Sequence, residues 1–181
     1  MRKTHRVLGL LLGAGALLAG TMTAAADTPA PKPAGDQLRA AAVQYQIVNK
    51  RSGLCLTPVV GSTGEGAALI QDICGSIGGQ AWEFDYRSGS DYRVRNAAVG
   101  RCVDLWYGFN HNGAAIFNWS CHENANQRWT ITYNGSGYYQ FQNAQAKTCL
   151  DVVDGFTQRG VPVDGWGCHG GDSQQWELRY I

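Results

Sequence analysis

The sequence predicts an all-β fold in which three equivalent units of 47 residues close around a threefold axis. Cysteines, glycines and a Gln-x-Trp motif recur at this interval without any insertion, which makes internal repetition the dominant signal. Each unit contains short alternating or apolar runs separated by Gly, Asn and Asp-rich turns, and no stretch has sustained helical periodicity. Three units are too few to form a long solenoid. An arrangement in which the three units close into a ring leaves no exposed sheet edge, and the sequence therefore favours it.

The repeat aligns residues of the same type in all three units. The matching positions are Tyr45, Tyr92 and Tyr139; Cys55, Cys102 and Cys149; Gly61, Gly108 and Gly155; Gly66, Gly113 and Gly160; Cys74, Cys121 and Cys168; Gln80, Gln127 and Gln174; and Trp82, Trp129 and Trp176. The second unit reads as four strands, "YRVRNA", "RCVDLW", "AAIFNWSC" and "QRWTITYN". The sequence therefore predicts about four strands per unit, with the three Gln-x-Trp tryptophans in the core.

The N-terminal segment differs in composition from the repeats. Residues 1–26 combine a basic start, an apolar run and small residues at Ala24 and Ala26, which is typical of a cleaved secretory signal peptide. Residues 27–43 form a Pro/Ala-rich leader, and residues 44–181 hold the repeats. Removing the signal peptide leaves 12 basic and 14 acidic residues, a net charge of −2. This balance argues against a nucleic-acid partner, and no later apolar run reaches membrane-spanning length.

The six cysteines all follow the signal peptide, and an even count in an exported chain favours disulfides. Each unit has two cysteines 19 residues apart. The repeat therefore predicts the bridges Cys55–Cys74, Cys102–Cys121 and Cys149–Cys168, each worth about 3 kcal/mol if unstrained. A metal site is the alternative, but no Cys-x-x-Cys pair occurs. We expect neither a metal nor a cofactor.

Three Cys…Cys…Gln-x-Trp units resemble the ricin B-chain-type lectin family, and the resemblance covers residues 44–181. It implies a β-trefoil, in which a six-stranded barrel is capped by three hairpins with pseudo-threefold symmetry. It also implies up to one shallow sugar site per unit. In that family a carboxylate lies two residues after the first cysteine, an aromatic two residues before the second, and an Asn before the Gln of Gln-x-Trp.

The second unit matches this pattern completely, with Asp104, Trp119 and Asn126. The combination suits a pyranose ring. An aromatic side chain covers the apolar face of the ring, a carboxylate accepts bonds from two hydroxyls, and an amide bonds at the rim. An Asp after a strand also caps turns, and a Trp near a disulfide is usually packing.

The third unit matches two of the three positions, with Asp151 and Trp166. Ser173 stands at the Asn position and is a weaker rim partner, for which Asp164 compensates, since the resemblance places a polar sugar contact there. We therefore expect a second site here that is poorer than the site of the second unit.

The first unit matches none of the positions, because Thr57, Asp72 and Gly79 stand in place of the carboxylate, the aromatic and the Asn. The cysteines, glycines and Gln-x-Trp remain there. Scaffold and site have thus separated within one chain, which favours the sugar reading of Asp104 and Asp151 over a purely structural one.

Loop residues follow the same division between units. Phe109 and Phe156 are equivalent and predict a second wall for each sugar cleft, whereas the first unit has Ser62. His111 and Asn112 lie in the same loop, where they are candidates for contacts at the ligand rim.

Other aromatic and titratable residues receive weaker assignments. Trp106 fits either packing or an exposed wall, and His122 and His169 are assigned to the surface, since two histidines from different units do not form one metal site. Asp104 and Asp151 belong to separate units, so they do not make the carboxylate pair of a glycosidase.

The sequence thus predicts a secreted, non-enzymatic, monomeric lectin for galactose- or xylose-type glycans, including plant or microbial polysaccharide. A protein-binding β-trefoil, such as a protease inhibitor or a toxin-associated component, is the alternative, although it rests on fold-level analogy. An inhibitor has no need of the set Asp104, Trp119 and Asn126.

Overall fold

The computed structural model describes residues 43–59, 64–75 and 78–181. The predicted signal peptide, nearly all of the predicted leader and Ser62 lie outside these residues. The strands of the described part are β1 (Tyr45–Asn49), β2 (Cys55–Pro58), β3 (Ala67–Asp72), β4 (Trp82–Ser88), β5 (Asp91–Asn96), β6 (Arg101–Leu105), β7 (Ala114–Ser120), β8 (Arg128–Tyr133), β9 (Tyr139–Asn143), β10 (Thr148–Val152), β11 (Val163–Gly167) and β12 (Trp176–Tyr180). Four strands in each unit confirm the predicted count.

Six of the strands form a closed antiparallel barrel. The ring runs β1–β4–β5–β8–β9–β12 and closes where β12 pairs with β1 over five positions. Each unit contributes its first and last strand, so no strand of the ring is left as an edge.

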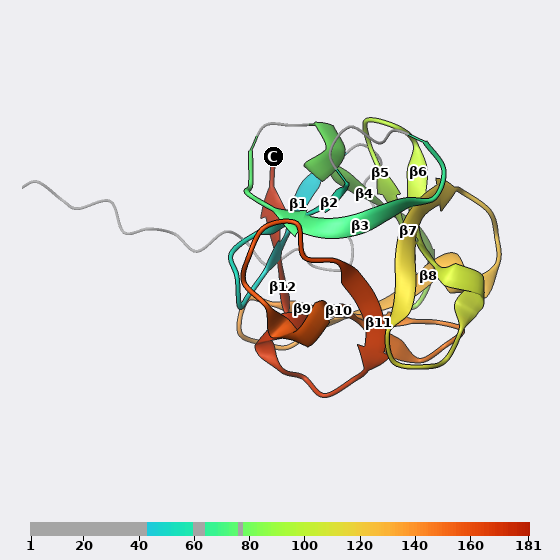
Figure 1. Ribbon diagram of the computed structural model, residues 1–181. Coiled ribbons are helices and arrows are strands. Elements are labelled where there is room, and N and C mark those ends of the chain that lie inside the picture. Colours follow the sequence, from blue (N-terminus) through green and yellow to red (C-terminus); the bar gives the residue numbers. More distant parts are fainter. Residues whose placement is uncertain (1–42, 60–63, 76–77) are drawn as a thin grey trace, which may run out of the picture.

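The other six strands form three hairpins that cap one end of the barrel. The hairpins β2–β3, β6–β7 and β10–β11 meet through β3–β7 and β7–β11 pairing and through a bridge between Ile70 and Pro162. In Figure 1 the strands β3, β7 and β11 surround the middle of the view, each from a different unit. This architecture is the β-trefoil.

The three tryptophans of Gln-x-Trp are fully buried in the core, as predicted. Each indole N–H donates a bond of 3.0 Å to the backbone oxygen of the residue after the first cysteine, which is Leu56, Val103 or Leu150. The tryptophans therefore both fill the core and tie each hairpin to the barrel. This hydrogen bond satisfies the indole N–H, which burial has removed from contact with water.

The three predicted disulfides are present, with Cα–Cα distances of 5.0 to 5.1 Å. Each joins the first strand of a hairpin to the segment after its second strand. The hairpin ends, where the candidate site residues lie, are thus covalently fixed.

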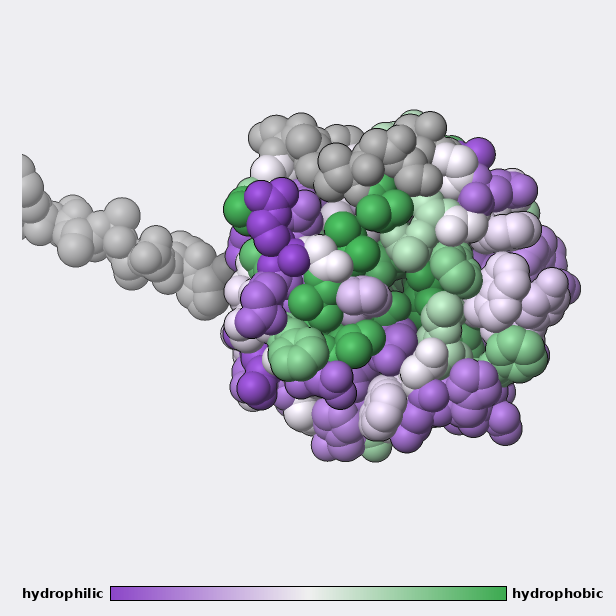
Figure 2. All heavy atoms as spheres, in the orientation of Figure 1, coloured by the Kyte–Doolittle hydropathy of each residue, from purple (hydrophilic) through white to green (hydrophobic). Residues whose placement is uncertain are grey.

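The capped face of the molecule has an apolar middle and a hydrophilic rim (Figure 2). The middle lies among β3, β7 and β11. Within the three described ranges, no helix has the length and apolar character needed to cross a membrane.

Candidate functional site

The carboxylate of Asp104 lies at the end of β6 and is held by two amides from the short turn η3 (Ala125–Gln127). Asn126 Nδ2 donates to Asp104 Oδ1 at 3.0 Å and also to the backbone oxygen of Leu105. Gln127 Nε2 donates to Asp104 Oδ2 at 2.7 Å and to the backbone oxygen of Ser120. Two side chains that follow each other in sequence therefore fix both carboxylate oxygens.

His122 provides a third contact, with Nε2 3.2 Å from Asp104 Oδ2. The backbone N–H of Asn124 donates to His122 Nδ1, so the proton of a neutral ring sits on Nε2 and points at the carboxylate. Burial raises the pKa of Asp104 above its ordinary value, and the contacts to Gln127, His122 and Asn126 oppose that rise. A carboxylate offers about four acceptor sites, so three donors leave about one for a ligand.

Asp104 opens onto a cleft of about 360 Å³. The lining residues are Asp104, Trp106, Tyr107, Trp119, His122, Asn124, Asn126 and Gln145. Trp106 and Trp119 meet edge to face, with ring centroids 6.0 Å apart. Trp106 also packs on Phe117 at 5.1 Å, so it serves both as packing and as cleft wall. The predicted trio Asp104, Trp119 and Asn126 is thus brought together in one hollow.

Gln145 reaches this cleft from the following unit. Asn143, at the end of β9, donates to the backbone oxygen of Asn126 and accepts from the backbone N–H of Gln145 and Ala146. The same arrangement occurs at Asn49, which bonds to the backbone oxygen of Ser173. Each of these two buried asparagines therefore docks a loop of one unit onto the site of the unit before it.

The turn after each carboxylate has an unusual backbone. Tyr107 and Asp154 occupy equivalent positions in η2 (Trp106–Gly108) and η4 (Val153–Gly155), with φ of 49° and 53°. Neither is glycine, so this left-handed conformation is strained, and such strain concentrates at functional sites. Tyr107 is 71% exposed and lines the second-unit cleft, while Asp154 lines the third-unit cleft.

The third unit repeats the arrangement with one bond fewer. Gln174, in η5 (Asp172–Gln174), donates from Nε2 to Asp151 Oδ2 at 2.8 Å, and His169 Nε2 lies 3.2 Å from the same oxygen. Ser173 stands where Asn126 stands in the second unit, and Asp151 Oδ1 has no hydrogen-bond partner among the described residues. Ser173 makes no bond to Asp151, so this carboxylate has one side-chain donor fewer than Asp104. The expectation that Ser173 is a weaker partner for a sugar stays a prediction.

The third-unit cleft has a volume of about 320 Å³ and an acidic lining. The lining residues are Arg51, Asp151, Asp154, Gly155, Asp164, Trp166, His169, Gly171, Asp172 and Ser173. Asp164 lies opposite Asp151 across β10 and β11 and is only 7% exposed. Burial, with the charges of Asp151 and Asp154, raises the pKa of Asp164 to about 7.

The first unit lacks the corresponding carboxylate, as predicted, and its substitutes serve the scaffold. Thr57 is buried, and its hydroxyl donates to the backbone oxygen of Pro58. A Cβ at Gly79 would approach the Thr57 hydroxyl to 3.1 Å. Asp72 forms a two-pronged ion pair with Arg159 of the third unit, at 2.9 and 3.2 Å. The residue that replaces the site aromatic in the first unit therefore has a structural role, because Asp72 holds a loop of the third unit in place.

This ion pair is one of three equivalent junctions between units. Glu65 accepts the backbone N–H of Ser120 at 3.2 Å, and Asn112 accepts that of Gly167 at 2.7 Å. Arg159 is the equivalent residue at the third junction, where it binds Asp72 instead. At each junction, the loop that carries Glu65, Asn112 or Arg159 thus bonds to the hairpin of the next unit.

Four predicted loop contacts, Phe109, His111, Asn112 and Phe156, lie outside the residues that line the two clefts. Phe109 is 45% exposed and stacks on His111, with ring centroids 5.5 Å apart. Phe156 is 51% exposed, and its backbone oxygen accepts from Gln71. The side chain of Asn112 accepts a bond at the junction just described.

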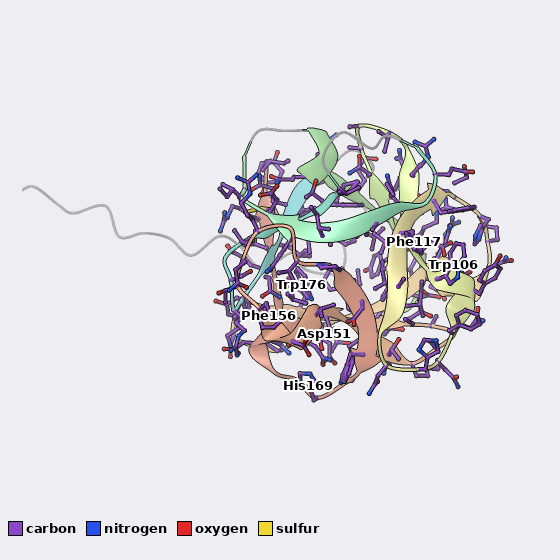
Figure 3. The ribbon with its side chains drawn as sticks, in the orientation of Figure 1. Trp106, Phe117, Asp151, Phe156, His169 and Trp176 are labelled. Carbon is purple, nitrogen blue, oxygen red and sulfur yellow. A yellow bond between two sulfur atoms is a disulfide. The ribbon has the colours of Figure 1, made fainter. Side chains whose placement is uncertain are left out.

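Figure 3 shows that the two sites lie apart on the molecule. Trp106 and Phe117 lie beside each other next to β7, while Asp151 and His169 lie together near β10 and β11. The buried Trp176 belongs to the scaffold of the third unit. The rigid barrel therefore presents two clefts at fixed separation.

Several residues that line the clefts are not recognisable from the sequence of a single unit. His122 is partly exposed to solvent and His169 is exposed, as expected, but both also bond to a carboxylate that lines a cleft. The repeat could have predicted this contact, because the equivalent position holds Gly75 only in the first unit, which also lacks the carboxylate. Gln145 and Arg51 come from the next unit, and nothing in the sequence pairs them with a site.

Comparisons with known proteins agree with this architecture. The family model of the ricin-type β-trefoil lectin domain matches residues 43–176. The designed threefold-symmetric protein ThreeFoil is similar in structure, with a TM-score of 0.75 and 28% identity over 76% of this chain and 99% of that chain. None of the curated proteins compared with the chain matches it significantly.

Two natural proteins are also similar in structure. An exo-β-1,3-galactanase from Clostridium thermocellum has a TM-score of 0.75 and 26% identity over 77% of this chain, which spans 30% of the galactanase. The C-half of an earthworm R-type lectin has a TM-score of 0.62 and 15% identity over 77% of this chain and 99% of that chain, a likeness that shows the fold alone. Because the family model covers well over half of the sequence, the chain belongs to the ricin-type β-trefoil lectin family.

Proposed function

We propose that this protein is a non-catalytic lectin that binds carbohydrate in the clefts of its second and third units. The observation that carries the proposal is the carboxylate of Asp104, which is 5% exposed, is fixed by three side-chain donors and lies in a cleft walled by tryptophan. A preorganised buried acceptor with about one free position suits a ligand hydroxyl.

The wall and rim of the cleft fit the two faces of a pyranose. Trp119 supplies an apolar surface for the C–H face of the ring, while the free acceptor position of Asp104 takes a hydroxyl at its edge. The amides of Asn126 and Gln145 lie at the rim, where each offers both donors and an acceptor. In the third unit, Asp151 and Trp166 take the corresponding roles.

Galactose- and xylose-type glycans, including plant or microbial polysaccharide, are the first ligands to test. Among the structurally similar proteins, one is an exo-β-1,3-galactanase and another is an earthworm lectin in complex with GalNAc. Each shallow cleft is expected to bind weakly. Two clefts on one rigid monomer then gain avidity on a polymer.

Export of the chain forms part of the same proposal. The signal-like residues 1–26 and the three disulfides both favour an extracellular setting, where disulfides persist. Extracellular polysaccharide would then be accessible to both clefts.

The test is retention on galactan and xylan beads with elution by free sugar, followed by calorimetry on the mature chain. Asp104→Asn should weaken binding at least about tenfold, because a hydrogen bond to a charged group contributes about 1.5–3 kcal/mol. Adding Asp151→Asn should remove the remaining retention on polymer.

Thr57→Val is the matched control, because it changes the same repeat position in the first unit. It should leave sugar binding intact. Unchanged binding in the double Asp variant would refute the site assignment. Retention that no sugar competes would instead favour a protein partner.

A further inference from the structure

The two clefts differ sharply in charge at equivalent positions. Moving from the second unit to the third, the repeat replaces Tyr107 by Asp154, Phe117 by Asp164 and Gln145 by Arg51. Asp172 also lines the third-unit cleft, but it is paired with Lys50 at 2.7 Å. The third unit therefore places carboxylates at Asp154 and Asp164, where the second unit has the aromatic residues Tyr107 and Phe117.

Two of these carboxylates are buried and incompletely bonded. Asp151 is 5% exposed and Asp164 is 7% exposed, and Oδ1 of each has no hydrogen-bond partner among the described residues. In the second unit the equivalent oxygen of Asp104 is satisfied by Asn126. Buried acceptors without donors are costly, so this pair favours a ligand that brings several N–H donors and a positive charge.

We propose that the third-unit cleft binds a sugar carrying a free, protonated amine, such as a 2-amino-2-deoxyhexose unit, with the ammonium group against Asp151 and Asp164. The inference rests on the proposed function, since it assigns a sugar class to a cleft already proposed to bind sugar. An ammonium group has three donors and no acceptor, which matches acceptors that lack partners. N-acetylation removes the charge and leaves only one N–H donor.

The basic side chains His169 and Arg51 in the same cleft do not reverse this preference. His169 bonds through Nε2 to Asp151 Oδ2, the oxygen that Gln174 also binds, and leaves Oδ1 unpaired. Arg51 lies over Gly155, with its Nε 3.3 Å from where a Cβ would stand. An anionic sugar attracted by Arg51 would face the carboxylates of Asp151 and Asp164, so repulsion disfavours it.

The experiment is an NMR titration of the intact mature protein at pH 7, where Asp164 is partly ionised, and the indole signals of Trp166 and Trp119 report the third and second clefts separately. Galactosamine and glucosamine are compared with their N-acetyl forms and with galactose and glucose. We expect the free amine to bind at the Trp166 cleft at least about tenfold more tightly than its N-acetyl form. The Trp119 cleft should show no such preference.

Three variants test whether Asp164 is responsible for the preference for a free amine. Asp164→Asn should bring the ratio of amine to N-acetyl affinity near one, whereas Asp91→Asn, which changes a carboxylate outside the cleft, should leave the ratio unchanged. Arg51→Gln, which installs the second-unit residue, should raise the amine affinity. A ratio near one in the unsubstituted protein, or displacement of the amine by calcium but not by other amines, would overturn the proposal. Sugar binding at Trp166 without amine preference would still support the proposed function, and no sugar binding there would refute both for this cleft.

Discussion

Gln127 donates a 2.7 Å hydrogen bond to Oδ2 of Asp104, so a residue of the repeated scaffold directly holds a site carboxylate. Its equivalent in the first unit, Gln80, makes the matching backbone contacts but has no carboxylate to hold. The same glutamine thus serves the fold in one unit and both fold and site in another.

Comparing Gln127→Leu with Gln80→Leu separates these two roles. Both should lower the free energy of unfolding by about 1–3 kcal/mol, because each leaves buried backbone groups unsatisfied. Only Gln127→Leu should also weaken sugar binding at the Trp119 cleft, by about tenfold, since Asp104 loses a donor. Urea denaturation and NMR titration measure the two effects. Equal loss of affinity in both variants would contradict the direct role of Gln127.

Gly108→Ala should disturb the second-unit cleft through Gln145. The added Cβ would lie 2.2 Å from the Gln145 amide nitrogen, so that side chain must leave its place at the cleft rim. Gly113→Ala is the matched control, because Gly113 also has a positive φ but no atom lies within 4 Å of the added Cβ. Both should lose about 1–2 kcal/mol of stability from the left-handed backbone. Only Gly108→Ala should reduce sugar affinity in calorimetry.

Arg159→Ala should weaken the third-unit cleft and spare the second. Removing Arg159 leaves the buried Asp72 unpaired and frees the loop that carries Asp154 and Gly155 into the cleft. We expect a several-fold loss of affinity at the Trp166 signal and a stability loss of about 1–3 kcal/mol. Arg179→Ala removes an exposed ion pair elsewhere and should change neither signal. A loss shared equally by both clefts would argue against this loop as the cause.

Stability should fall as the pH rises toward neutrality, because of Asp164. Its pKa is raised from 3.8 to about 7, so between these values the folded chain holds a proton that the unfolded chain releases. The stabilisation is complete below the unfolded value and is lost as the pH rises through about 7. Unfolding in urea at pH 5 and pH 8 should therefore show a larger decrease for the unsubstituted protein than for Asp164→Asn, by roughly 1 kcal/mol or more.

Other charged groups share this environment, and each is common to both proteins in the comparison. The residues that line the same cleft are Arg51, Asp151, Asp154, His169 and Asp172. An identical pH dependence in Asp164→Asn would assign the effect to one of these instead.

The fold was predictable because its determinants repeat. Three copies of the same cysteine, glycine and tryptophan pattern specify the hairpins, the disulfides and the core, and a feature present three times is distinguishable from local noise. That Asp104 and Trp119 come together in one cleft was predictable for a related reason, since the first unit, which lacks both residues, provides an internal comparison.

The parts of the site that escaped prediction depend on contacts between units. Gln145 and Arg51 lie in loops whose position is set by Asn143 and Asn49, through bonds to the backbone of another unit. The roles of Asp72 and Asn112 were missed for the same reason, because both act at junctions. The repeat reveals residues that the three units have in common, whereas these residues differ between the units and act through contacts from one unit to another.

Because Arg51 lines the third cleft, the two clefts are completed at different stages of chain synthesis. The residues around the second cleft, 104 to 145, follow one another along the polypeptide. The third cleft joins Arg51, near the start of the domain, to residues 151 to 173 near its end. It is completed only when β12 emerges from the ribosome and pairs with β1. A sugar bound at the third cleft, as proposed above, would therefore contact residues from both ends of the domain, whereas a sugar at the second cleft would contact residues 104 to 145.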